Sequence, residues 1–407
     1  MKRTPLDDPI VVTGMGAYGA GAATPAALYQ TALRGRSVGE WLTLPGLAEP
    51  VAVSRAPDPA LAQPELRYAR RLDRSAQLAM AAAADAVNQS RLVHGVDPAE
   101  VGVVMGSSRG PIGRTLESAD ELARGAVGPT ASAESTPASL SGMIAQAYGF
   151  GAATATLAAT CASAATAICM GALLLAAGEA EAVVVGGAEA PLIPLLAAQL
   201  RAARVVGWDE DPAATCKPFD ARRNGLMMGE GAAALVLERA STAARRAVPI
   251  LARLSGWAAG SDKGGRTGVT IDGAGLVRVT RRALERAGLD PAQIGYVNAH
   301  GTATRLNDPV EARALNVVFG RGAVPPSSST KPITGHCLGA TPALEAVIAI
   351  ESLRNGRLPP TANHVDLDAE CELDVVAAAA RATTTSAVLS TSLGFWGVQA
   401  ALIFEAA

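Results

Sequence analysis

Short runs of apolar residues alternate along the chain with longer stretches that are rich in alanine and leucine. This alternation predicts strands followed by helices, and so indicates an α/β fold. Within each run the apolar residues are mostly consecutive, which is typical of strands that helices cover on both faces. The runs expected to form strands are residues 10–12, 101–105, 183–185, 233–237, 295–298 and 387–389.

A stretch rich in glycine and charge, GWAAGSDKGGRTG at residues 256–268, separates one series of strand and helix patterns from a second. Glycine clusters of this kind commonly mark breaks between elements. We therefore expect two halves, residues 1–255 and 256–407. With 407 residues, 49% of them hydrophobic, the chain is long enough to bury a sizeable core.

Charge and cysteine content exclude several classes of protein. The 35 basic and 37 acidic side chains leave a formal net charge of −2, which gives no overall electrostatic case for binding nucleic acid or an anionic membrane. Asp7 and Asp8 stand where a signal peptide needs apolar residues, and no apolar run reaches about 18 residues without glycine or charge, so we expect a cytoplasmic protein. The five scattered cysteines contain no C-x-x-C pair, which indicates reduced thiols and neither disulfides nor a metal site.

Cys161 lies between a predicted strand and a predicted apolar helix, in the segment TATLAATCASAATAICMGALLLAAG at residues 154–178. The positive end of a helix dipole lowers the pKa of a thiol, and small neighbours leave room for an acyl group, so Cys161 is a candidate nucleophile. Cys169, deeper in the same helix, is interpreted as an inert core thiol. Free cysteines are more often inert than reactive, so this segment alone leaves both interpretations of Cys161 open.

Two histidines of the second half occupy comparable settings. His300 ends a predicted strand, and Asp308 is expected to cap the helix that follows. His336 lies with Lys331 in a polar turn before another apolar helix. Because ligands of layered α/β sheets bind at the carboxyl ends of strands, Cys161, His300 and His336 are expected to converge there. A cysteine with two histidines, outside any metal-like spacing, indicates acyl transfer with acid/base assistance.

The sequence GMGAYG after the first apolar run fits the G-x-G-x-x-G pattern of dinucleotide-binding enzymes, with Glu40 at a suitable distance for a ribose ligand. That site needs its last glycines at the start of a helix, whereas Thr24 and Pro25 predict a helix that begins later. We therefore interpret these glycines as a tight loop that another part of the backbone approaches closely, and not as a dehydrogenase motif.

Five motifs, in order along nearly the whole chain, resemble those of the β-ketoacyl-acyl-carrier-protein synthases of fatty acid and type II polyketide assembly, in the thiolase superfamily. They are VVTGMGAYGAG, TCASA around Cys161, KPFDARRNGLMMGEGAAALVLE from Lys217, VNAHGTATRLNDPVEA around His300, and STKPITGHCLGATPALEA around Lys331 and His336. The resemblance implies a thiolase-like five-layered αβαβα fold of two duplicated halves, and a dimer through the N-terminal half. It also implies substrates carried on the phosphopantetheine of an acyl carrier protein, no other cofactor, and a second subunit that is identical or a chain-length factor.

The resemblance further implies a decarboxylative Claisen condensation. Cys161 would take the acyl chain, and malonyl carrier would then lose carbon dioxide and attack the Cys161 thioester. His300 and His336 would support decarboxylation and the enolate. The backbone N–H groups of Cys161 and Phe395 would form the oxyanion hole for acylation.

Four more residues match supporting positions of the family. Lys331 and Glu311 correspond to an ion pair, and Thr302 and Thr304 correspond to residues that hydrogen-bond the pantetheine arm.

The sequence departs from the family pattern in two places. Asn307 replaces a glycine in the turn after His300, which is tolerable because asparagine accepts a left-handed backbone more readily than most residues. The C-terminal gating loop, usually GFGGTN, reads GFWGVQ at residues 394–399: it keeps Phe395 but places Trp396 where a flexible glycine is expected. We expect Trp396 to influence which acyl chains reach Cys161, which favours a specialised polyketide or polyene enzyme over housekeeping fatty-acid elongation.

Two other functions of thiolase-fold proteins remain as alternatives. One is an acyltransferase that passes the acyl group to an alcohol or amine without decarboxylation; both histidines and Lys331 favour condensation over it. The other is a non-catalytic chain-length factor, and Cys161 argues against it because that class normally lacks the cysteine.

Overall fold

The computed structural model describes residues 8–59, 61, 69, 71–265 and 268–407. Residues 1–7, on which part of the targeting expectation rests, lie outside the described residues. Each of the six predicted strands corresponds to a strand of the structure. These are β1 (Ile10–Gly19), β4 (Val101–Gly106), β6 (Ala182–Glu189), β8 (Gly231–Arg239), β10 (Tyr296–Asn298) and β14 (Ala387–Leu393).

Two sets of five strands have the same topology. The first set is ordered β5-β4-β6-β8-β1 and the second is ordered β11-β10-β14-β15-β9. When the strands of each set are numbered along the chain, both orders read third, second, fourth, fifth, first. In each set the first two pairings are parallel and the last two are antiparallel. A short pairing of β1 with β9 joins the sets. The shared strand order and direction confirm that the chain contains two duplicated halves. The strands not yet bounded are β5 (Thr154–Leu157), β9 (Ala252–Ser261), β11 (Ser327–Ser328) and β15 (Val398–Glu405).

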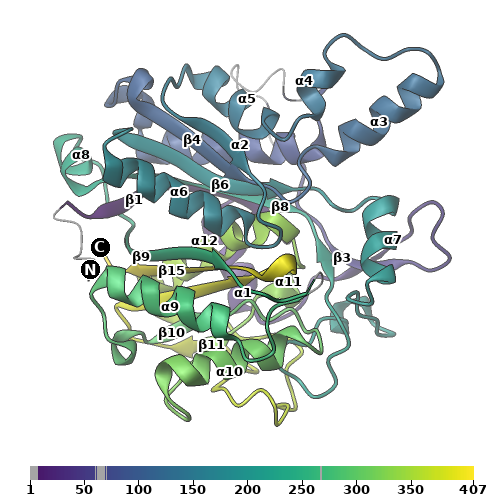
Figure 1. The fold of residues 1–407 in the computed structure, drawn as a ribbon, viewed down its shortest axis with the longest axis vertical. Coiled ribbons are helices and arrows are strands. Elements are labelled where there is room, and N and C mark those ends of the chain that lie inside the picture. Colours follow the sequence, from purple (N-terminus) through teal and green to yellow (C-terminus); the bar gives the residue numbers. More distant parts are fainter. Residues whose placement is uncertain (1–7, 60, 62–68, 70, 266–267) are drawn as a thin grey trace.

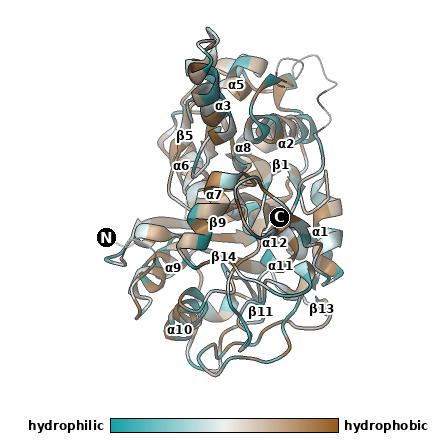
Figure 2. Ribbon diagram, turned by 90° about the vertical axis from the view of Figure 1, so that its right-hand side faces the viewer, coloured by the Kyte–Doolittle hydropathy of each residue, from teal (hydrophilic) through white to brown (hydrophobic). Residues whose placement is uncertain are grey.

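The two sheets enclose a central layer of helices, and other helices cover their outer faces (Figures 1 and 2). Helices α6 (Ser163–Ala177) and α12 (Thr341–Asn355) pack on both sheets and on each other. Helices α2 (Arg74–Ser90) and α5 (Ser139–Tyr148) cover the first sheet, and α9 (Ala274–Ala287), with α10 (Asn307–Phe319) packed against it, covers the second. The chain therefore has the five-layered αβαβα fold that was expected.

Smaller elements complete the fold outside these layers. The helices are α1 (Pro25–Leu33), α3 (Ile112–Ala123), α4 (Ala131–Ser135), α7 (Pro194–Ala202), α8 (Ala240–Arg245) and α11 (Lys331–Thr334). The strands are β2 (Glu40–Leu42), β3 (Val51–Ser54), β7 (Met228–Gly229), β12 (Arg357–Leu358) and β13 (Arg381–Ala382).

The interpretation of GMGAYG as a loop is wrong, because these residues lie inside β1. A Cβ atom at Gly14 or Gly16 would overlap the backbone carbonyl oxygens of Ala86 and Ala82 in α2. The glycines thus let α2 lie directly on β1. The expected close backbone approach is present, but it occurs within a strand and not in a loop. No helix starts at them, as a dinucleotide site would require.

The predicted division between the two halves, at residue 255, falls within β9, which continues to Ser261. The segment Thr160–Ala177 has the length and mean hydropathy, 1.8, of a membrane span, but it contains α6, which is packed between the two sheets as core helices are.

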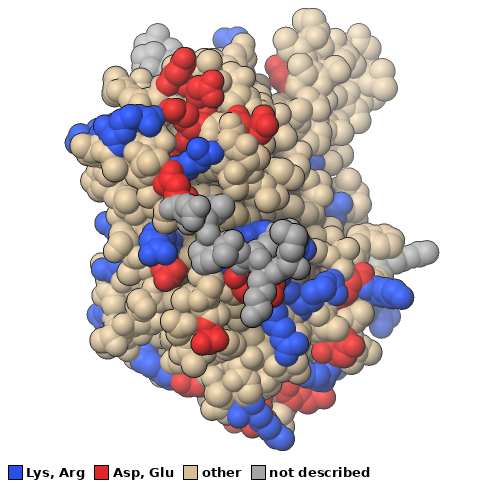
Figure 3. Space-filling view, turned by 60° about the vertical axis from the view of Figure 1, so that its left-hand side comes forward, with Lys and Arg blue, Asp and Glu red and all other residues tan. Residues whose placement is uncertain are grey.

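On the face shown in Figure 3, acidic and basic side chains are interspersed among broad uncharged areas, in keeping with the nearly balanced charge.

Candidate active site

One cavity of about 630 Å³ contains most of the candidate site residues. Cys161 enters it from the turn before α6, His300 from the end of β10, and His336 from the turn before α12. The three side chains converge, as expected, because corresponding strand ends of the two halves face the same space. Thr302, Thr304, Phe395 and Trp396 also line the cavity. Lys331 and Glu311 lie behind it, fully buried.

A strained turn presents Cys161. The preceding residue, Thr160, has a φ of 47°, a left-handed conformation that is unusual for a β-branched side chain. The Ser163 hydroxyl fixes this turn, because it donates to the Thr160 carbonyl oxygen at 2.6 Å and accepts from the backbone N–H of Ala159 at 2.9 Å. Helix α6 begins two residues after Cys161. The thiol therefore stands at the end of a strand–turn–helix unit, as predicted.

The expected lowering of the thiol pKa is wrong. Burial raises the pKa of Cys161 to about 12, although the positive charges of Lys331 and Arg109 act in the opposite direction. The free-energy cost of removing water from a thiolate exceeds the stabilisation that the helix terminus and these cations provide. The thiol is neutral at pH 7 and needs a base to give up its proton.

His336 lies where such a base is needed. Its Nε2 lies 3.2 Å from Sγ of Cys161, and its Nδ1 lies 3.0 Å from Oγ1 of Thr341. When Nδ1 donates to the Thr341 hydroxyl, Nε2 is free to accept the thiol proton. Burial, and after it the charge of Lys331, holds the pKa of His336 well below its usual range, so the imidazole is neutral.

His300 is the second imidazole of the cavity, and its ring lies edge-on to that of His336 with centroids 5.4 Å apart. Burial, followed by the charges of Lys331 and His336, also lowers its pKa far below the usual value. The Glu311 carboxylate fixes the backbone here by accepting the N–H groups of His300 at 2.7 Å and Gly301 at 2.8 Å. Two neutral imidazoles therefore face the space beside the thiol.

The predicted ion pair between Lys331 and Glu311 is wrong. Nζ of Lys331 lies 2.5 Å from Oε1 of Glu345 in α12, and it also donates to the carbonyl oxygen of His300. Glu311 instead holds the His300 backbone and accepts from the Thr391 hydroxyl at 2.7 Å. Burial raises the pKa of Glu345 to about 7 despite its cationic partner. The sequence analysis did not single out Glu345; the packing of α12 brings it to Lys331.

Asp308 does not cap α10, which begins one residue earlier, at Asn307. Its buried carboxylate accepts backbone N–H groups from Phe219 at 2.8 Å and from Thr302 and Ala303 at 3.1 Å each. It thereby fixes the loop that carries Thr302. Asn307 is helical and has no left-handed backbone, so a glycine is not needed there for conformational reasons.

The Thr302 and Thr304 hydroxyls lie 2.9 Å apart and line the cavity beside Asn307. Hydroxyls in this position can donate to and accept from an amide-containing arm that enters the cavity. That geometry is compatible with their expected role toward pantetheine.

The predicted gating loop lies against the nucleophile turn. A Cβ atom at Gly394 would lie 3.1 Å from the backbone N of Cys161 and would overlap the Thr160 hydroxyl, so only glycine fits. Thr160 Oγ1 in turn donates to the carbonyl oxygen of Phe395 at 3.3 Å. The backbones of Cys161 and Phe395, which the oxyanion-hole expectation names, are therefore close together.

Trp396 is 60% exposed and has a φ of 63°, the left-handed region that a glycine would occupy without strain. It lines the cavity and is not packed into the core of this chain.

Sequence reasoning missed Glu189, which ends β6. Its buried carboxylate accepts backbone N–H groups from Ser108 at 2.7 Å and from Arg109 and Gly339 at 3.0 Å each. It joins the loop after β4 to the turn before α12. An acidic residue at the end of an apolar strand, GGAE, was the available signal.

Comparisons with known proteins agree with this geometry. The profile of the Beta-ketoacyl synthase N-terminal domain matches residues 7–243, and that of the Beta-ketoacyl synthase C-terminal domain matches residues 251–365. A Streptomyces halstedii protein whose name places it among the polyketide beta-ketoacyl synthases is 32% identical over 409 residues, with 97% of each chain covered. The 3-oxoacyl-[acyl-carrier-protein] synthase 2 of Staphylococcus aureus is 33% identical over 345 residues, which cover 83% of this chain and 85% of that protein.

Among solved structures, the ishigamide ketosynthase/chain length factor superposes with a TM-score of 0.88 at 27% identity, covering 98% of this chain and 99% of the other. The two profiles together span most of the sequence and contain the cysteine turn and both histidine loops. The chain therefore belongs to the β-ketoacyl synthase family.

Proposed function

We propose that the protein is a ketosynthase of type II polyketide biosynthesis, which joins an acyl group held on Cys161 to malonyl carrier with loss of carbon dioxide. The observation that carries this proposal is the contact of Cys161 Sγ with His336 Nε2 at 3.2 Å, with the neutral His300 ring beside it. One thiol and two neutral imidazoles suit both half-reactions of a decarboxylative condensation.

In the acylation step, Sγ of Cys161 attacks the carbonyl carbon of the carrier thioester while its proton passes to Nε2 of His336. The backbone N–H groups of Cys161 and Phe395 receive the developing oxyanion. The bond to the carrier sulfur then breaks, and the proton on His336 passes to that sulfur. The carrier leaves as a thiol and the acyl group remains on Cys161.

In the condensation step, the bond between the malonyl α-carbon and its carboxylate breaks, and carbon dioxide departs. The electron pair forms an enolate whose oxygen accepts hydrogen bonds from His300 and His336. Because the Thr341 hydroxyl can either accept or donate, His336 can carry its proton on Nε2 at this stage. The α-carbon attacks the Cys161 thioester, the C–S bond breaks, and the sulfur takes up a proton from solvent, which the reaction consumes.

The buried charges around the histidines support this step. Burial, and after it the charge of Lys331, lowers the pKa of both imidazoles, so they enter the reaction neutral and donate hydrogen bonds to negative charge. Lys331 also contacts the His300 carbonyl oxygen. Thr302 and Thr304 would hold the phosphopantetheine arm. These two steps use no cofactor beyond that arm, which arrives with the substrate.

Two observations favour the polyketide assignment over fatty-acid elongation. The relative named as a polyketide synthase aligns over 97% of the chain, whereas the fatty-acid type relative aligns over 83%. Trp396 also changes the loop that a housekeeping enzyme would be expected to keep.

We propose an acyl carrier protein and a second thiolase-fold subunit, identical or a chain-length factor, as partners, and a cytoplasmic location. Among the described strands, the edge strand β5 pairs with β4 alone. Beside it, α6 exposes Met170 (38%) and Leu173 (45%), an apolar surface that a second subunit would cover.

The test combines the purified protein with acyl carrier thioesters and malonyl carrier. A β-ketoacyl carrier two carbons longer than the acyl donor, with release of carbon dioxide, supports the proposal. Transfer of the acyl group to an amine or alcohol without carbon dioxide release would support the acyltransferase alternative. Parallel reactions with saturated and poly-β-keto donors separate fatty-acid from polyketide elongation.

A further inference from the structure

The catalytic cavity carries positive charge that the condensation does not use. Arg109, Arg204 and Arg305 line it, and no aspartate or glutamate is among its described lining residues. Within the described part of the chain, none of these three guanidinium groups has an ion-pair or side-chain hydrogen-bond partner. Because the chain as a whole is slightly acidic, this wall differs from the average surface.

Arg109 differs from the other two arginines in its position. Arg305 belongs to the same loop as Thr302 and Thr304, where the pantetheine arm is proposed to lie, and Arg204 follows α7. Arg109 follows β4, which pairs with β5, the strand that leads to Cys161, and its charge acts against the burial that raises the pKa of that thiol. Arg109 is therefore associated with the thiol, which holds the acyl group.

The backbone that presents Arg109 is fixed. Glu189 accepts the N–H groups of Ser108 and Arg109 and the Ser108 hydroxyl, at 2.7 to 3.0 Å, and the Ser107 hydroxyl accepts the N–H of Gly110 at 2.9 Å. A rigid loop thus places a solvent-accessible, unpaired guanidinium at a cavity that is otherwise lined largely by apolar side chains and hydroxyls. A guanidinium there forms charge-assisted hydrogen bonds with carboxylate or carbonyl oxygens and gains nothing from a hydrocarbon chain.

We propose that Arg109 is a specificity-determining residue that selects, for attachment to Cys161, acyl groups bearing an oxygen function, a carboxylate or a ketone, over plain hydrocarbon chains. The inference rests on the proposed function, because it concerns the acyl group that Cys161 accepts. It identifies the chemical class of that acyl group and the residue that recognises it.

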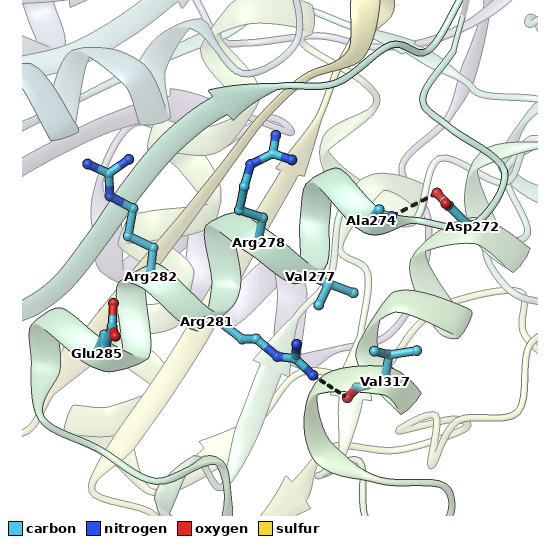
Figure 4. Close-up of a pocket in the computed structure, with 8 residues that line it drawn as sticks. All are labelled: Asp272, Ala274, Val277, Arg278, Arg281, Arg282, Glu285 and Val317. Carbon is cyan, nitrogen blue, oxygen red and sulfur yellow. Dashed lines mark hydrogen bonds between the residues drawn. The ribbon is translucent and has the colours of Figure 1, made fainter. Parts of the chain in front are cut away.

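The test measures acylation of Cys161 by mass spectrometry with three pantetheine thioesters of equal carbon number: butyryl, acetoacetyl and succinyl. Pantetheine replaces the carrier protein so that carrier docking does not contribute. The variants are Arg109→Leu and Arg109→Lys. Arg282→Leu, which changes an exposed arginine on the outer face of α9 (Figure 4), is the matched control.

The wild type and Arg282→Leu are expected to prefer succinyl and acetoacetyl over butyryl. Arg109→Leu is expected to lower this preference about tenfold, and Arg109→Lys to recover it for succinyl, because a carboxylate responds to charge. A preference for succinyl alone identifies a carboxylate, and one for acetoacetyl alone identifies a ketone.

Several results would overturn the inference. They are an unchanged preference in Arg109→Leu, an equal loss with all three thioesters, or loss of the oligomer in that variant, which would show that Arg109 pairs with a carboxylate of a second subunit. If wild-type Cys161 accepts none of the thioesters, and acyl carrier donors also fail, the proposed function itself is wrong. Acylation without preference for oxygen overturns only the role of Arg109.

Discussion

The two halves share one topology but supply different chemistry at equivalent strand ends. The third strand of the first half, β5, leads to Cys161 and then α6, while the third strand of the second half, β11, leads to His336 and then α12. The second strands end in the loops of Arg109 and His300, which are fixed by Glu189 and Glu311 respectively. The comparison teaches that one scaffold position can carry a thiol in one copy and, in the other, the imidazole that contacts it.

The most severe way to break this arrangement is to remove the nucleophile. Cys161→Ala is expected to lower condensation by about 10⁴-fold or more, because no other cysteine is among the described residues that line the cavity. Mass mapping after treatment with a cerulenin-like electrophile should find label on Cys161 alone. Cys169→Ala, which changes a buried thiol in α6, is the control and should label normally. Label on Cys169 or Cys337 would contradict the assignment.

The two histidines should separate the half-reactions. His300→Ala and His336→Ala are each expected to lower condensation by about 10²- to 10⁴-fold. Only His336 contacts the thiol, so only His336→Ala should also slow acylation of Cys161 strongly. Acylation and carbon dioxide release are measured separately with acyl and malonyl carriers. Equal acylation rates in the two variants would show that the Sγ–Nε2 contact does not transfer the proton.

The neutral histidines should also make stability depend on pH. Their pKa values are lowered in the folded state, so between pH 6.5 and those values the unfolded chain binds more protons and stability falls as the pH falls. The double variant His300→Asn/His336→Asn should lose about 2.7 kcal/mol less stability than the wild type between pH 7.5 and 5.5, because each of the two groups contributes about 1.36 kcal/mol per pH unit below 6.5.

Urea unfolding at the two pH values measures this difference. Asp308 and Glu345, whose pKa values burial raises to about 6 and about 7, act in the opposite direction in both proteins and cancel in the comparison. Identical pH dependence in the wild type and the double variant would contradict the assignment of neutral buried histidines.

The smallest expected effect concerns the gating loop. Trp396→Gly removes an indole from the cavity wall and relieves a left-handed backbone, while glycine adds freedom to the unfolded chain, so stability should change by no more than about 1 kcal/mol. The relative acylation rates across saturated and unsaturated acyl carriers should shift severalfold. An unchanged preference together with a large loss of stability would identify a packing residue instead.

The sequence patterns predicted the layers and the convergence of Cys161, His300 and His336, because hydrophobic runs and strand ends are local properties of the chain. The resemblance implied the wrong partner for Lys331, Glu311 in place of Glu345, because the partner depends on how α12 packs. The thiol pKa was also missed, because desolvation depends on the surrounding fold and not on the helix that follows Cys161. The glycines of β1 were misread because a close helix on a strand and a tight loop require the same residue.

Cys161 and His336 precede α6 and α12, the two helices of the central layer, which pack against each other between the sheets. The separation of the reacting sulfur and nitrogen is therefore set by the innermost part of the protein, not by its outer helices. Loosening of the periphery on heating should leave that separation intact. The first step of the reaction should then remain available up to the temperature at which the whole domain unfolds, so that loss of acylation and loss of structure coincide.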